Sequence, residues 1–255
     1  MKKILVLGCT GSIGTSTLNI VRNMPEDFTI CGLTAHSNKK SLELLSNEFS
    51  CDSVFTSKDG VNAIEYLIQK TKPDIIVNGI AGAAGLLPSK IVIDCGVNLA
   101  LANKETVVMA WPLIKDLAFD KNCKIIPVDS EHSAIFSLIN QVGINNVKKV
   151  IITASGGPFR TYSHEELEKV TVEQALKHPT WSMGKKITID SASLANKGLP
   201  SLLYPIKIRS SFTFKSSKSL DNFILNSFNL SLLGTLLLFS YLLIVLSFLF
   251  PPKSK

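Results

Sequence analysis

A run of regularly spaced glycines directly after the first apolar segment constrains this chain more than any other feature. Residues 4–7 are Ile-Leu-Val-Leu, and Gly8, Gly11 and Gly14 follow at intervals of three. Glycines here let the backbone turn sharply from a strand into a helix, whose first N–H groups can then approach a pyrophosphate. The spacing differs from the commoner Gly-x-Gly-x-x-Gly, so a plain strand-to-helix turn is the alternative. We favour a dinucleotide site.

Short apolar segments recur along the chain and alternate with helical patterns. Residues 16–24 have apolar side chains at helical spacing, and residues 41–49 begin with Ser41, a residue type that caps helices. This alternation predicts parallel βαβ units, and therefore an α/β fold with a Rossmann-type, doubly wound parallel sheet. The strands are expected at residues 4–7, 28–33, 74–77, 97–101, 124–128 and 147–152.

The end of the expected second strand favours one dinucleotide over another. An acidic residue at this point usually binds the ribose of NAD, but residues 35–40 are Ala-His-Ser-Asn-Lys-Lys and contain no carboxylate. Polar donors and lysines suit the 2′-phosphate of NADP, so we predict NADPH as the cofactor. The alternative is that Lys39 and Lys40 are solvated residues at a helix start.

Two further segments carry residues typical of ligand binding. Asp129 and Glu131 follow an expected strand two positions apart, so they share one side if the strand continues and can converge on Mg²⁺ or Mn²⁺. Solvated turn residues are the alternative. Residues 190–198 combine hydroxyl, amide and ammonium donors, a mixture that holds a phosphate monoester, although a capped helix start would look similar.

Composition bears on partners and compartment. The net charge is +7, but after residue 200 six basic side chains face one acidic one, so the body is nearly neutral and no nucleic-acid partner is predicted. Five scattered cysteines, none paired at a metal or redox spacing, favour a reducing compartment. Residues 230–250 carry no charge and are long enough to cross a bilayer as a helix.

Several segments together resemble the 1-deoxy-D-xylulose 5-phosphate reductoisomerase family over residues 1–199, in order and at family-like spacing. These segments are residues 11–14, 101–105, 127–131, 155–160, 178–186 and 189–199. The resemblance implies an NADPH- and cation-dependent enzyme. Such an enzyme rearranges and reduces 1-deoxy-D-xylulose 5-phosphate to 2-C-methyl-D-erythritol 4-phosphate in non-mevalonate isoprenoid biosynthesis.

The resemblance also implies roles for individual residues. Asp129 and Glu131 would bind Mn²⁺ or Mg²⁺, and with Lys104 and His178 they form the implied catalytic set. The residues implied to hold NADPH are Thr10, Gly11, Ser12, Ile13, His36, Ser37, Asn38, Asn103 and Glu105, although His36 and Ser37 replace the more usual Gly-Lys. The residues implied to contact the sugar phosphate are Lys104, Ser130, Ser155, His178, Ser191, Asn196 and Lys197.

The sequence departs from the family at Pro200, where the resemblance implies a glutamate that serves as a third cation ligand. We therefore expect an NADPH-binding domain at residues 1–126, a partial catalytic domain at 127–205 and a divergent tail at 206–255. Activity is expected to be impaired, with the tail a truncation or gene-model artefact. The alternative is a non-catalytic, membrane-tethered NADP-binding protein.

We expect a cytoplasmic location, with a plastid-type organelle or membrane association as alternatives. The homodimer implied by the resemblance is doubtful here.

Overall fold

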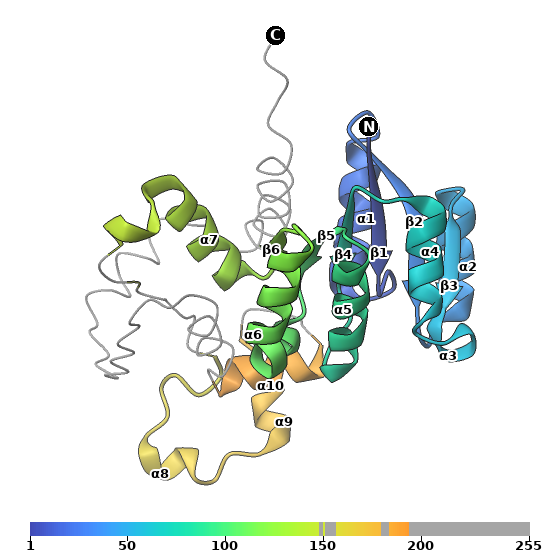
Figure 1. Ribbon diagram of the computed structural model, residues 1–255. Helices are drawn as coiled ribbons and strands as arrows, with labels where there is room; N and C mark the ends of the chain where they lie inside the picture. Colours follow the sequence, from blue (N-terminus) through green and yellow to red (C-terminus); the bar gives the residue numbers. More distant parts are fainter. Residues whose placement is uncertain (148–149, 151–156, 180–183, 194–255) are drawn as a thin grey trace. The chain divides into compact units, whose positions relative to one another are not determined.

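In the computed structural model, the described residues form one six-stranded sheet in which all strands run parallel, in the order β3-β2-β1-β4-β5-β6 (Figure 1). The structure describes residues 1–147, 150, 157–179 and 184–193. The strands are β1 (Lys2–Leu7), β2 (Phe28–Ala35), β3 (Asp52–Phe55), β4 (Ile75–Asn78), β5 (Asn98–Leu101) and β6 (Ile125–Pro127). The order reverses between β1 and β4, and this switch point is where ligands of open α/β sheets bind.

Helices connect the strands, as expected for parallel pairing. Those of the sheet region are α1 (Ser12–Asn23), α2 (Lys39–Glu48), α3 (Thr56–Asp59), α4 (Ala63–Thr71), the 3₁₀ turn η1 (Ala83–Gly85), α5 (Leu86–Asp94) and α6 (Lys104–Asp120). The later ones are α7 (Ser130–Val142), η2 (Ile144–Asn146), α8 (His164–Leu167), α9 (Val172–Ala175) and α10 (Lys185–Ala192).

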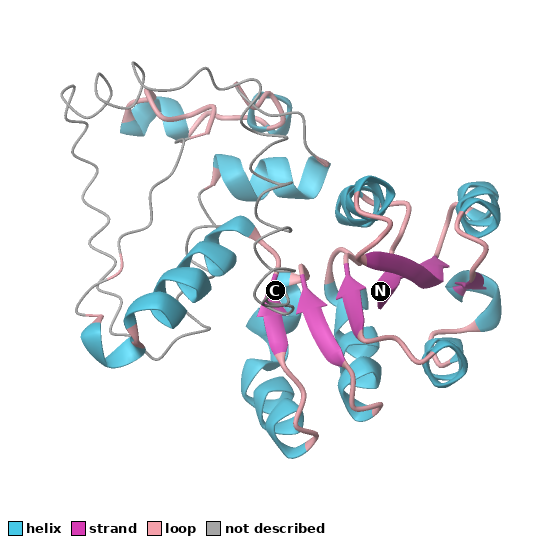
Figure 2. Ribbon diagram, turned by 90° about the horizontal axis from the view of Figure 1, so that it is seen from above, coloured by secondary structure: helices cyan, strands magenta, loops and turns pink. Residues whose placement is uncertain are grey.

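Successive side chains of the strands point to opposite faces of the sheet and form two apolar layers, and helices cover both faces (Figure 2). Ile4 and Val6 of β1 lie in one buried cluster with Leu18 of α1 and Leu42 of α2. Leu5 points the other way, because a Cβ built on Gly32 of β2 would lie 3.0 Å from its Cδ1 and 3.3 Å from Leu67 of α4. Two helical layers around one parallel sheet confirm the predicted Rossmann-type fold.

The chain divides into two compact units. The described residues of the first unit are 1–136, and those of the second lie between 137 and 193. In the second unit, Ser163 begins α8 with a capping box: its hydroxyl accepts from the Glu166 N–H, and the Glu166 carboxylate accepts from the Ser163 N–H. Thr171 and Gln174 form the same arrangement at α9. The expected domain limits at residues 126 and 205 stay a prediction.

The structure adds one strand and moves one helix start. β3 was not expected, because Asp52 and Ser53 open it and it is only four residues long at the edge of the sheet. The helix expected from Ser41 begins at Lys39, and Asn38 caps it by accepting a 3.0 Å hydrogen bond from the Ser41 N–H. The strand expected at residues 147–152 lies almost wholly outside the described residues.

No helix within the described ranges has the length and apolar character needed to cross a membrane. Residues 230–250, the span predicted from composition, lie outside those ranges.

Candidate functional site

The glycine-spaced turn sits at the carboxyl end of β1, beside the switch point. Gly8 has a φ of +77°, a conformation that favours glycine, and its N–H donates to the Thr34 carbonyl of β2 at 3.1 Å. A Cβ on Gly14 would lie 2.4 Å from the Gly8 carbonyl oxygen, so only glycine lets α1 start this close to the turn. Gly11 occupies the N-cap position without a side-chain cap, which leaves the first N–H groups of α1 available to an anion.

The predicted dinucleotide residues Thr10, Gly11 and Ser12 are exposed on this turn. Ile13 is half-buried, and a Cβ on Gly79 would lie 3.0 Å from the Ile13 Cβ, so the Ile13 side chain packs against the segment that follows β4. The structure therefore places all four residues at the switch point, with the Ile13 side chain packed inward.

The second predicted cofactor segment follows β2. His36 Nδ1 lies 3.1 Å from the Thr56 hydroxyl, and the Asn38 side chain caps α2, so two polar side chains of the segment already have protein partners. Ser37 is exposed. Lys39 pairs with Glu43 at 3.4 Å on the surface of α2.

Asn103 is buried and joins the start of α6 to the segment after β4. Its Oδ1 accepts from the Thr106 N–H at 2.8 Å and from the Thr106 hydroxyl at 2.6 Å. Its Nδ2 donates to the carbonyls of Ile80 at 2.7 Å and Gly82 at 2.8 Å, and it lies 3.1 Å from Glu105 Oε2. Asn103 therefore fixes a loop at the switch point as well as capping a helix, and its contact with NADPH stays a prediction.

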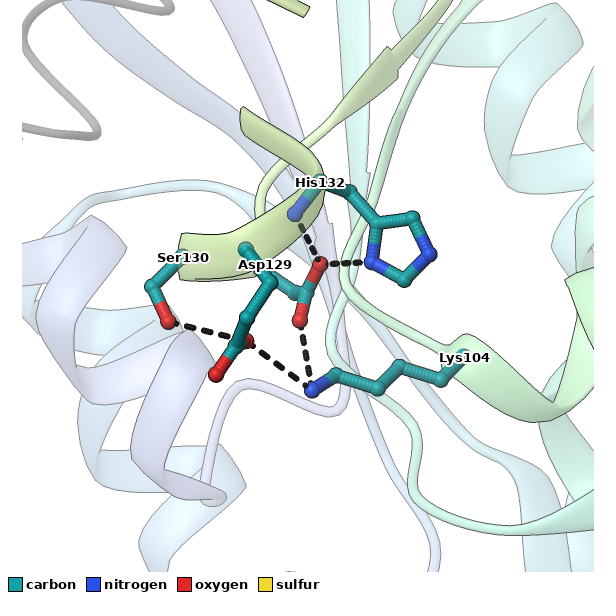
Figure 3. A network of polar contacts seen from close by, with 5 residues as sticks. Lys104, Asp129, Ser130 and His132 are labelled. Carbon is teal, nitrogen blue, oxygen red and sulfur yellow. Dashed lines mark hydrogen bonds and ion pairs between the residues drawn. The ribbon is translucent and has the colours of Figure 1, made fainter. Parts of the chain in front are cut away.

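Lys104, the next residue, points at the predicted metal ligands. Its Nζ lies 2.6 Å from Asp129 Oδ2 and 3.3 Å from Glu131 Oε2 (Figure 3). All three side chains are largely buried, with exposed fractions of 23%, 9% and 10%. The Ser130 hydroxyl donates to Glu131 Oε2 at 3.0 Å. Both carboxylates can thus contact one cationic atom, which is the arrangement that a shared cation requires.

The route to this convergence differs from the one expected. The strand does not continue through the acidic pair: β6 ends at Pro127 and α7 begins at Ser130. Asp129 and Glu131 therefore do not share a strand face. They converge because the chain turns into α7 between them, so that one carboxylate precedes the helix and the other lies in its first turn.

His132 completes the cluster. Its backbone N–H donates to Asp129 Oδ1 at 3.0 Å, and its ring Nδ1 contacts the same oxygen. The ring proton is assigned to Nδ1 because the carboxylate can only accept. His132 Nε2 is buried and makes no hydrogen bond to any described residue. One oxygen of Asp129 is therefore held by His132, while the other faces Lys104.

These contacts shift two pKa values. Burial raises the pKa of Asp129, but the His132 hydrogen bond and the Lys104 charge outweigh burial and hold it well below its usual range. Burial lowers the pKa of Lys104, but Asp129 and Glu131 outweigh that effect and raise it above its usual value. The Asp129 carboxylate and the Lys104 ammonium therefore stabilise each other's charged form.

In the second unit, two predicted substrate residues are described. The His178 side chain is half-buried, and burial lowers its pKa. Ser191 is buried in α10, and a Cβ on Gly157 would lie 3.1 Å from the Ser191 carbonyl oxygen, so Gly157 lies close to α10. Ser155, Asn196 and Lys197 lie outside the described residues, as do residues 180–183 of the segment at 178–186 that resembles the family, whose last two residues open α10.

Sequence reasoning assigned no role to His132 or Asn78. Asn78 ends β4 fully buried, and its Nδ2 donates to the Gly85 carbonyl at 3.0 Å and to the Ser89 hydroxyl at 2.8 Å. The sequence signal for a role of Asn78 was an amide residue at the end of an apolar strand. The signal for a role of His132 was its place three residues after an aspartate at the start of a helix.

Fold and site together define an α/β protein with a dinucleotide-type turn at its switch point and a carboxylate–lysine cluster after its last described strand. A model of 1-deoxy-D-xylulose 5-phosphate reductoisomerase matches residues 4–60 and 55–111. A model of the C-terminal domain of the same enzyme matches residues 125–203. The chain belongs to the 1-deoxy-D-xylulose 5-phosphate reductoisomerase family, which confirms the resemblance.

Individual relatives agree. The 1-deoxy-D-xylulose 5-phosphate reductoisomerase of Treponema denticola is 51% identical over 207 residues, which cover 78% of this chain and 54% of the relative. The Treponema pallidum enzyme is 47% identical over 204 residues, with the same two coverages of 78% and 54%. The chain thus spans about half the length of the curated relatives it matches.

Solved structures give the same result. A crystal structure of DOX-P reductoisomerase in complex with NADPH, fosmidomycin and magnesium has a TM-score of 0.69 and 34% identity, covering 81% of this chain and 59% of that one. The Zymomonas mobilis enzyme in complex with NADPH has a TM-score of 0.67 and 34% identity, covering 79% of this chain and 57% of that one.

Proposed function

We propose that this chain binds NADPH and a divalent cation and acts on 1-deoxy-D-xylulose 5-phosphate, yielding 2-C-methyl-D-erythritol 4-phosphate. The observation that carries the proposal is the convergence of Asp129 and Glu131 on one cationic atom, at 2.6 and 3.3 Å, in a chain of this family. The solved relative that contains NADPH, fosmidomycin and magnesium supports the same ligand set.

The residues present fit NADPH. The uncapped N–H groups at the start of α1 suit its pyrophosphate, and the glycine at position 14 leaves the space that a Cβ would fill. The segment His36–Ser37–Asn38 offers donors and no carboxylate near the expected 2′-phosphate. NADPH would supply the hydride for the reduction step.

The residues present also fit Mg²⁺ or Mn²⁺. Hard carboxylate oxygens from Asp129 and Glu131 are the ligands these ions prefer, and the Lys104 ammonium shows that both can reach one positive centre. When bound, the cation would act as a Lewis acid on the substrate's ketone oxygen.

The chain's other residues would bind and orient the substrate. His132 would hold Asp129 in place through its fixed oxygen, and Lys104 would present its ammonium to substrate oxygens. Ser130, His178 and Ser191 would donate to the sugar phosphate, together with Ser155, Asn196 and Lys197. Such donors would fix the carbon skeleton for rearrangement and hydride transfer.

Turnover tests this proposal directly. The full chain is incubated with NADPH, 1-deoxy-D-xylulose 5-phosphate and Mn²⁺, and NADPH absorbance is followed. We expect weak, cation-dependent oxidation, and higher activity in a form that carries Pro200→Glu and a family-type C-terminal region, because a third carboxylate completes the cation site. Asp129→Asn in the repaired form is the control and should abolish the gain. NADPH oxidation absent from both forms would contradict the proposed activity.

The homodimer, the cytoplasmic location and the domain limits remain predictions. Analytical ultracentrifugation of the purified full chain would test the first of these.

A further inference from the structure

The position of the Lys104 ammonium carries an inference beyond substrate binding. Lys104 Nζ contacts Asp129 Oδ2 at 2.6 Å and Glu131 Oε2 at 3.3 Å. The other Asp129 oxygen, Oδ1, accepts from the backbone and ring of His132 (Figure 3). The Asp129 oxygen available to a cation is therefore the one that the lysine contacts.

We propose that Lys104 and a divalent cation bind these carboxylate oxygens alternately, so that cation loading releases the Lys104 ammonium toward the substrate. This proposal rests on the proposed function, because it describes how the divalent cation comes to occupy the same site. Two carboxylates carry two negative charges, which one divalent cation balances alone. Adding the ammonium at the same oxygens would place like charges within a few ångströms in a largely buried site, which is strongly unfavourable.

The Lys104 side chain can change position while its backbone stays fixed. Its side chain is a compact charge on a flexible four-carbon stem, and 23% of it is exposed. The preceding residue, Asn103, ties the start of α6 by four protein hydrogen bonds to Thr106, Ile80 and Gly82. The ammonium can thus leave the carboxylates without any displacement of α6.

This exchange has two consequences. The carboxylates never lie buried without a positive partner, which would be costly. The cation and the substrate also bind in a favoured order, because the lysine becomes available to substrate oxygens only after the cation has taken its place. Lys104 would then couple the two binding events.

The test measures Mn²⁺ affinity of the full chain by electron paramagnetic resonance of free Mn²⁺, without substrate. Lys104→Met removes the competing charge and keeps the stem, so we expect Mn²⁺ to bind about tenfold more tightly, within the usual range of coupled sites. Lys104→Arg keeps the charge and binds carboxylates at least as strongly as lysine does. The Mn²⁺ affinity of this variant should therefore be equal to or lower than that of the unmodified chain.

A matched control comes from α5. Lys90 also pairs with a carboxylate, Asp94 Oδ2, at 2.6 Å, but on an exposed surface. Lys90→Met should change Mn²⁺ affinity by less than about twofold, because exposed pairs contribute little. Equal or weaker Mn²⁺ binding in Lys104→Met than in Lys90→Met, or no Mn²⁺ binding by any form, would overturn the proposal.

A second measurement avoids substitution altogether. The unmodified chain is treated with an amine-acylating reagent with and without Mn²⁺, and labelling at Lys104 is quantified by mass spectrometry. We expect labelling of Lys104 to rise several-fold with Mn²⁺ while labelling of Lys90 stays constant. Unchanged labelling of Lys104 in Mn²⁺-saturated protein overturns the exchange. Neither measurement needs turnover, so absent NADPH oxidation would count against the proposed activity alone.

Discussion

Replacing Asn103 with alanine should destabilise the sheet unit by more than the loss of a helix cap. The cap itself contributes about 1 kcal/mol. The two bonds from Nδ2 to the Ile80 and Gly82 carbonyls contribute about 1 kcal/mol each, by the usual net value of a buried hydrogen bond. Together these give a loss of about 3 kcal/mol in the free energy of unfolding.

Asn38→Ala provides the matched comparison. Asn38 caps α2 through one bond to the Ser41 N–H at 3.0 Å and lies on the surface, so its loss should cost about 1 kcal/mol. A third variant, Asn103→Asp, keeps the oxygen that caps α6 but loses the donor to the loop. The stability of Asn103→Asp should fall between those of the two alanine variants.

The assay is urea unfolding of the full chain followed by tryptophan fluorescence. The chain has two tryptophans, and Trp111 lies in α6, so a Trp181→Phe background reports on this helix alone. If Asn103→Ala shifts the unfolding midpoint no more than Asn38→Ala does, the loop contacts of Asn103 contribute nothing and the reasoning fails.

Further predictions concern two glycines, two buried thiols and the Asp129 carboxylate. Gly14→Ala should abolish NADPH-induced fluorescence quenching and cost about 3 kcal/mol or more, because its Cβ would lie 2.4 Å from backbone. Gly32→Ala, which meets flexible leucine side chains at 3.0 Å or more, should cost about 1 kcal/mol; equal losses would refute the steric argument. Burial raises the pKa of Cys9 to about 11 and of Cys51 to about 12, so these two thiols should react with iodoacetamide at neutral pH more slowly than a free cysteine; rapid alkylation of either would contradict this. The lowered pKa of Asp129 contributes stability above its unfolded pKa of about 3.9, and that stability is lost as pH falls through the folded value. Asp129→Asn should therefore flatten the acid limb of stability measured by circular dichroism, and an unchanged limb would show that another group dominates.

The fold was largely predictable from the sequence, because five of the six described strands are short apolar runs followed by helical patterns. β3 was missed because its first residues, Asp52 and Ser53, are polar and because the strand lies at the edge of the sheet. The glycine turn was predictable because Gly8 and Gly14 are needed for reasons that spacing reveals: a positive φ and a close approach.

The candidate site was less predictable in its geometry. The types and order of Lys104, Asp129 and Glu131 indicated a cation site, but only the structure shows that the pair converges around the start of α7. His132 and the loop contacts of Asn103 could not be predicted, because a sequence shows which residues are neighbours along the chain and not which way their side chains point.

Asn103 and Lys104 are consecutive, and they face different halves of the site. Asn103 holds the loop beside the dinucleotide turn, whereas Lys104 reaches the carboxylates. Neighbouring Cα atoms are about 3.8 Å apart across any trans peptide. Covalent geometry, and not packing alone, therefore sets the spacing between the loop's anchor and the carboxylates' anchor. An inserted residue between them would change the register of the two halves at once, however well the rest of the chain repacked.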